Sequence, residues 1–66
     1  MKVITYPDGD KSWAEEFDSV EDVEKELEVS ADDEYRDNVM SKIRAGETHF
    51  TIANGPDTED IWEVIP

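Results

Sequence analysis

The middle of the chain carries apolar residues at helical spacing, whereas the runs near both ends have the composition and alternation of β-strands. Val20, Val23 and Leu27 stand at positions i, i+3 and i+7, which places them on one side of a helix. Asp18 or Ser19 opens this helix, because each has an acidic residue three positions later, the spacing of a capping box. We expect the helix to end near residue 29.

A second helix is expected directly after the first. Ser30 is its predicted N-cap, and the acids that follow lie in the first turn, where the helix dipole favours negative charge. Its apolar stripe consists of Tyr35, Val39 and Ile43, with Met40 at the edge. Gly46 follows two basic residues and predicts a left-handed stop.

The remaining apolar runs predict strands. They span residues 2–6, 12–17, 48–53 and 61–65. Pro7 and Gly9 supply the backbone angles of a tight turn between the first two runs, which predicts a hairpin. The order β-β-α-α-β-β predicts a single small α+β domain over residues 1–66. In it, an antiparallel or mixed sheet of about four strands is covered on one face by two helices.

The large aromatic residues fit this sheet. Trp13, Phe17, Phe50 and Trp62 occur at strand alternation, which favours a place in the core over a role as binding anchors. A sheet covered on one side leaves its other face in water, so one tryptophan is expected to be exposed there.

Negative charge dominates the composition and is unevenly spread. The chain has 19 acidic and 6 basic residues and a formal net charge of −13. Residues 18–34 contain nine acids and one lysine, so this quarter of the chain carries −8. Such a field repels nucleic acids and anionic membranes and favours basic protein partners. We therefore expect no direct contact with nucleic acid or membrane.

The acids of this central stretch are the predicted binding site. They are Asp18, Glu21, Asp22, Glu24, Glu26, Glu28, Asp32, Asp33 and Glu34. Residues four apart on a helix stand about 6 Å apart, which is close to the separation of successive phosphates along a nucleic-acid strand. Carboxylates on a rigid helix could therefore imitate a phosphate backbone for a protein that normally binds one.

Catalytic, metal and cofactor sites are not predicted. His49 is the single histidine, the chain has no cysteine, and no activated nucleophile can be assembled from these residues. The segment Asp8-Gly9-Asp10 begins like a calcium loop but lacks its later glycine and closing glutamate. We expect a non-enzymatic protein without metal or cofactor. The short apolar run at the start predicts neither a signal peptide nor a membrane span, and hence a cytoplasmic protein.

In size, charge and element order the whole chain resembles phage-encoded anti-CRISPR proteins and other DNA mimics, which are typically small, acidic and free of cysteine. The resemblance implies an inhibitor that occupies the basic DNA-binding surface of a host defence complex, a type I Cascade within that class, and blocks target DNA. For a phage-encoded protein the cytoplasm would be that of the host cell. Independently of the resemblance, we expect a monomer and not an oligomer.

Two other readings of the charge remain open. The chain could be an acidic interaction module, such as an antitoxin or a regulatory subunit. Alternatively, the acidity could serve solubility or reflect a halophilic source.

Overall fold

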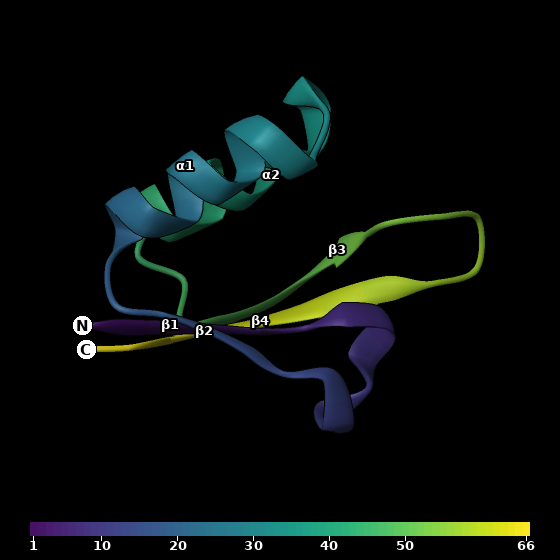
Figure 1. The fold of residues 1–66 in the computed structure, drawn as a ribbon, viewed down its shortest axis with the longest axis horizontal. Helices are drawn as coiled ribbons and strands as arrows, with labels where there is room; N and C mark the ends of the chain where they lie inside the picture. Colours follow the sequence, from purple (N-terminus) through teal and green to yellow (C-terminus); the bar gives the residue numbers. More distant parts are fainter.

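The computed structural model describes residues 1–66 as one α+β domain with the expected order of elements. The strands and helices are β1 (Lys2–Tyr6), β2 (Glu15–Phe17), α1 (Val20–Ser30), α2 (Asp33–Arg44), β3 (His49–Ala53) and β4 (Glu59–Ile65). All strand pairs are antiparallel, and the strand order is β2-β1-β4-β3. Both helices cover one face of this sheet, and the two termini lie side by side at one end (Figure 1).

The two terminal strands form the centre of the sheet. β1 pairs with β4 along its whole length, from Lys2 opposite Ile65 to Tyr6 opposite Ile61. β2 and β3 are the edges. The hairpin between β1 and β2 is confirmed, and the sheet closes only when the last strand of the chain inserts beside the first.

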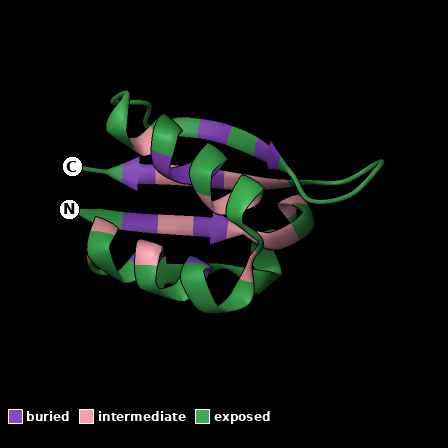
Figure 2. Ribbon diagram, turned by 90° about the horizontal axis from the view of Figure 1, so that it is seen from above, coloured by how far each residue is buried: buried purple, intermediate pink, exposed green.

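The core lies between the sheet and the helices. Its buried apolar members are Val3, Val23, Leu27, Val39, Met40, Phe50, Ile52, Trp62 and Val64. α1 packs on β1 and β2, and α2 packs on β3. Figure 2 shows the alternation along the strands, where buried residues are separated by more exposed ones. The predicted helix stripes and strand alternation therefore place the correct faces inward.

The start of α2 differs from the sequence prediction. Asp32, and not Ser30, is the N-cap: its carboxylate accepts a hydrogen bond from the backbone N–H of Tyr35 at 2.8 Å. Ser30 is the last residue of α1, where its hydroxyl donates to the carbonyl of Glu26. Aspartate and serine are equally good N-caps. Because α1 extends to Ser30, Asp32 is the residue that caps α2. The predicted cap of α1, Ser19, is confirmed.

The end of α2 follows the prediction. Gly46 has φ +84°, in the left-handed region. Its N–H donates to the carbonyl of Ile43, and the N–H of Glu47 donates to that of Lys42. These two bonds form a Schellman motif, which satisfies carbonyls that the helix itself leaves free.

The predicted strand 12–17 is wrong over its first half. Residues Lys11–Trp13 form a 3₁₀ turn, and β2 begins only at Glu15. The Asp10 carboxylate accepts hydrogen bonds from both the N–H and the hydroxyl of Ser12, which fixes the turn and lowers the pKa of Asp10. As a result Trp13 is 69% exposed and is not part of the core.

The other tryptophan occupies the centre of the core. Trp62 is 1% exposed, and its ring stacks between those of Phe17 and Phe50 at centroid separations of 6.2 and 6.4 Å. These separations lie within the range of favourable aromatic pairs. Of the four large aromatics assigned to the core, Trp13 is thus the exception. It lies in the 3₁₀ turn and not on the uncovered face of the sheet, where an exposed tryptophan was expected.

Candidate acidic site

Most of the predicted acidic residues are exposed, but they do not share one side of the molecule. Eight of the nine are exposed to solvent, and Glu24 is half-buried. At 100° per residue, the acids of α1 spread over both flanks and the outer side of that helix. Six of the nine fall into two groups, one along α1 and one at the end of the sheet, and Asp18, Asp22 and Asp33 belong to neither.

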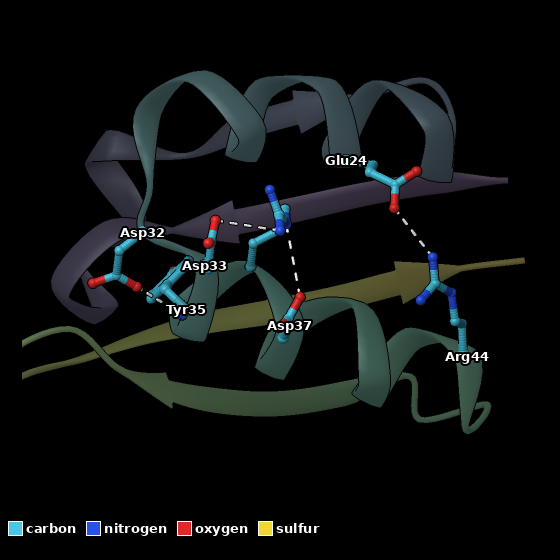
Figure 3. Close-up of polar contacts among 7 residues, drawn as sticks. Glu24, Asp32, Asp33, Tyr35, Asp37 and Arg44 are labelled. Carbon is cyan, nitrogen blue, oxygen red and sulfur yellow. Dashed lines mark hydrogen bonds and ion pairs between the residues drawn. The ribbon is translucent and has the colours of Figure 1, made fainter.

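The first group is the outer stripe, defined here as Glu21, Glu24 and Glu28. These residues follow one another at i, i+3 and i+7 along α1. Glu21 and Glu28 are exposed on its outer side, whereas Glu24 flanks the buried residues and is half-buried. Glu24 is held by Arg44 of α2, with an Oε2–Nη2 distance of 3.1 Å (Figure 3). Glu21 and Glu28 have no ion-pair partner and lie about 10 Å apart along the helix axis.

The second group surrounds a groove of about 720 Å³ between the α1–α2 turn and the turn that joins β3 to β4. Its acidic residues are Glu15, Glu26, Asp32, Glu34 and Asp60, and no lysine, arginine or histidine lines it. We call this feature the acidic groove. Five acidic residues from both layers of the fold thus line one open space, and no cationic residue lines it.

Aromatic and aliphatic side chains line the interior of the acidic groove. Phe17, Leu27, Tyr35 and Trp62 all contribute to its wall. Trp62 and Leu27 belong to the buried core, whereas Phe17 and Tyr35 are only partly buried. Of the aromatic residues that line the groove, only Phe17 and Tyr35 are therefore partly open to solvent.

A hydrogen-bond network fixes residues on one side of the groove. Asp60 accepts from the backbone N–H of Asp8 at 2.8 Å, from the Asn54 amide at 2.5 Å and from the Tyr35 hydroxyl at 2.5 Å. The Tyr35 hydroxyl in turn accepts from the indole N–H of Trp62 at 3.2 Å. Burial, followed by the hydrogen bond to Asp60, raises the pKa of Tyr35 well above its ordinary value, so it stays a neutral donor.

The cations lie away from the groove and are mostly engaged. Arg36 contacts Asp33 at 3.3 Å and Asp37 at 3.7 Å (Figure 3). The other ion pairs are Lys2–Glu16, Lys42–Glu47 and Arg44–Glu24. Lys11 lies over the ring of Tyr6, and Lys25 makes no ion pair. Five of the 19 acids have a cationic partner, which leaves 14 without one.

Three of the nine predicted residues thus belong to the groove, namely Glu26, Asp32 and Glu34. Asp18 and Asp22 lie at the start of α1, and Asp33 is paired with Arg36. Sequence reasoning missed Glu15 and Asp60, because it followed charge density along the chain. The signal for Glu15 was its place on the second strand of the predicted hairpin, opposite Thr5 at the end of the sheet.

No protein-family model, curated protein or solved structure matches this chain. Neither helix has the length and apolar content that crossing a membrane requires. The structure contains no group of three or more acidic or histidine side chains arranged to hold a metal ion.

Proposed function

We propose that this protein binds a basic, nucleic-acid-binding surface of a host defence complex and thereby blocks access of target DNA. The observation that carries the proposal is the number of carboxylates displayed without a cation on a compact scaffold. Fourteen acids lack an ion-pair partner, in a domain whose extents are 29 × 25 × 21 Å. A surface of this charge attracts clustered lysine and arginine and accelerates encounter with them.

The magnitude of the charge supports a use beyond solubility. A net charge of about 2–8 keeps a small domain soluble, and this chain carries −13. Repulsion within the folded state grows with net charge and destabilises it. Binding of a basic partner would relieve that repulsion. Among host defence complexes with a basic DNA-binding surface, a type I Cascade is the one that we propose to test.

The experiment is a competition assay. Labelled target duplex is titrated onto a purified type I Cascade complex with and without the protein, at low and at high ionic strength. We expect the protein to displace the duplex, and the displacement to weaken as salt screens the charges. Unchanged binding of the duplex at saturating protein concentration contradicts the proposal.

Charge reversals locate the surface. The variant Glu21→Lys with Glu28→Lys removes the two unpaired carboxylates of the outer stripe. The control is Asp57→Lys with Glu63→Lys, which changes the net charge equally at positions off the helices and away from the groove. We expect the helix variant to inhibit more weakly than the control. Equal loss in both variants would mean that net charge alone, and no particular surface, is recognised.

A further inference from the structure

The two edges of the sheet differ in how they are protected. A free edge displays backbone N–H and C=O groups, and proteins block pairing there with short strands, charged side chains, proline or bulges. The β2 edge is protected, since it is three residues long and two of them are glutamates. The β3 edge is five residues long, contains no proline and no acidic or basic residue other than His49, and pairs with β4 in unbroken register. β3 is therefore the unprotected edge.

The pairing with β4 determines which backbone groups of β3 point outwards. The carbonyl of Thr48, just before the strand, accepts a hydrogen bond from the N–H of Val64 on β4. In an antiparallel pair, every second residue bonds to the neighbouring strand, and the residues between direct their N–H and C=O groups to the other side. Counted from Thr48, the outward residues are His49, Thr51 and Ala53. All three are exposed, and none makes a backbone hydrogen bond outside the sheet.

The side chains of this edge define the pattern of a strand that fits it. β3 is the outermost strand on its side of the sheet, and its buried and exposed residues alternate (Figure 2). Phe50 and Ile52 belong to the core under the helices, whereas Thr51 and Ala53 lie on the uncovered face. An added strand would place every second side chain at the margin of the core, where apolar residues fit. The others would lie in water beside two small side chains.

Charge selects the residues on the uncovered face of such a strand. Glu59 on β4 is opposite Ala53, accepts a hydrogen bond from the Thr51 hydroxyl at 2.9 Å and has no cationic partner. An added strand lies about 10 Å from β4, so a lysine or arginine side chain on it extends over Thr51 and Ala53 towards this carboxylate. A second copy of the chain would instead bring −13 against −13.

We propose that the β3 edge binds an extended segment of a basic protein, in which lysine or arginine alternates with apolar residues, and adds it to the sheet as a fifth strand. Main-chain hydrogen bonds provide the affinity of such complexes, and alternate side chains provide the selectivity. The identity of the basic protein rests on the proposed function. The edge is separate from the outer stripe of α1 and is tested on its own.

The test is a titration of the ¹⁵N-labelled protein with acetylated, amidated Lys-Val-Lys-Val-Lys, followed by NMR. One control peptide has the same residues with every backbone nitrogen methylated, which keeps the charge and removes the donors. The other, Gln-Val-Gln-Val-Gln, keeps the backbone and removes the charge. We expect saturable shifts of the amide signals of His49, Thr51 and Ala53 with the lysine peptide, weaker binding of the glutamine peptide and none of the methylated one. The amides of β2 are the internal control and should not shift.

A matched pair of variants tests the backbone contact. Thr51→Pro removes an N–H that points away from β4, so no bond of the sheet is lost, and proline is tolerated at such edge positions. Thr51→Val keeps the N–H and loses the same hydroxyl. We expect the proline variant to bind the lysine peptide at least about tenfold more weakly than the valine variant, because it lacks the donor and its ring blocks the edge.

A second pair tests the charge contact. Glu59→Gln and Glu21→Gln each remove one negative charge, but only Glu59 lies behind the β3 edge. We expect Glu59→Gln to weaken binding of the lysine peptide about twofold to fivefold and to leave binding of the glutamine peptide unchanged. Glu21→Gln should leave both unchanged.

Three outcomes would overturn the proposal. Equal binding of the methylated peptide, or of the lysine peptide to both Thr51 variants, would mean that the backbone of the edge is not used. Equal binding of the glutamine peptide would mean that charge does not select the ligand. Shifts of the β3 amides that depend on protein concentration without any peptide would show that a second copy occupies the edge. The wild-type comparison of peptides decides the matter even if the proline variant does not fold. Failure of this titration rejects the strand-addition site alone, whereas failure of the DNA competition assay rejects the proposed function.

Discussion

Replacing Tyr35 with phenylalanine removes one hydroxyl that ties the helical layer to the sheet. This hydroxyl donates to Asp60 and accepts from the indole of Trp62. Trp62 is 1% exposed, so its N–H has no access to solvent once the acceptor is gone. Asp60 keeps its two other donors, from Asp8 and Asn54. The substitution therefore leaves a buried donor without a partner and one carboxylate with fewer bonds.

The expected cost follows from these two losses. A hydrogen bond to a charged group contributes about 1.5–3 kcal/mol, and a buried donor without a partner costs about 1–3 kcal/mol. Tyr35 is half-buried, so water replaces part of the lost interaction on its open side. We expect the free energy of unfolding to fall by about 2–3 kcal/mol. For a domain of this size, that lowers Tm by about 10–20 °C.

The assay is urea denaturation followed by far-ultraviolet circular dichroism and tryptophan fluorescence. Tyr6→Phe is the matched control, because the Tyr6 hydroxyl makes no side-chain hydrogen bond and the residue is likewise half-buried. It should change stability by no more than about 0.5 kcal/mol. Equal stability of the two variants would refute the reasoning that the Tyr35 network joins the two layers.

The same variant has a defined pH dependence. The pKa of Tyr35 is raised in the folded state above its ordinary value of 10.0, first by burial and then by Asp60. The unfolded chain therefore loses this proton at lower pH than the folded protein does. The stabilisation is fully present below about pH 10 and is lost as the pH rises above it. The gap in urea midpoint between wild type and Tyr35→Phe should narrow above pH 10 and stay constant between pH 6 and 9.

Further predictions concern the helix ends and the net charge. Asp32→Ala should lower the free energy of unfolding by about 1 kcal/mol and Ser30→Ala by under about 0.5 kcal/mol, because only Asp32 caps α2. Urea denaturation measures both changes, and the reverse order would show that Ser30 is the cap. Gly46→Ala should cost about 1 kcal/mol, and Gly46→Asn less, since φ there is +84° and no atom crowds the site. Raising NaCl from 10 to 150 mM should raise Tm. The Debye length then falls from about 30 to 8 Å, so the added ions screen the repulsion that arises from the net charge of −13. A falling Tm would show that the ion pairs outweigh that repulsion.

The helices and the order of elements along the chain could be predicted because independent signals agreed. In α1, the apolar spacing of Val23 and Leu27 and the Ser19 cap all indicate the same helix, and both residues are buried. In α2, the buried Val39 and the left-handed Gly46 do the same. Where periodicity, caps and stops coincide, local energetics and tertiary packing favour the same structure.

The errors arose where short polar contacts decided the structure. The segment around Trp13 has the alternation of a strand, but the Asp10 carboxylate binds Ser12 and turns the chain before β2 can begin. Such side-chain-to-backbone bonds compete with strand pairing and leave no periodic signal in the sequence. The same holds for the choice between Ser30 and Asp32 as the cap of α2, since both residue types are good caps.

The acidic groove could not be predicted because it depends on strand order. Glu15 and Asp60 are far apart in the sequence, and they line the same groove only because β1 and β4 pair at the centre of the sheet. The charge of residues 18–34 pointed to α1 as the site. The fold instead divides that charge between the outside of the helix and the groove, where it adds to acids from two strands.

The placement of the cations distinguishes a binding site from a surface that only confers solubility. One last prediction follows from it. Solubility is served when acids and bases alternate, as they do along α2, where Arg36 lies between Asp33 and Asp37. The groove has the opposite arrangement, because none of its five acidic residues has a cationic partner. Neutralising two of them in the variant Glu15→Gln with Glu34→Gln should relieve repulsion and leave Tm unchanged or higher at low ionic strength. The charge-matched variant Asp33→Asn with Asp37→Asn should lower Tm, because it removes both ion-pair partners of Arg36. An equal change of Tm in the two variants would mean that the placement of the cations has no effect on stability.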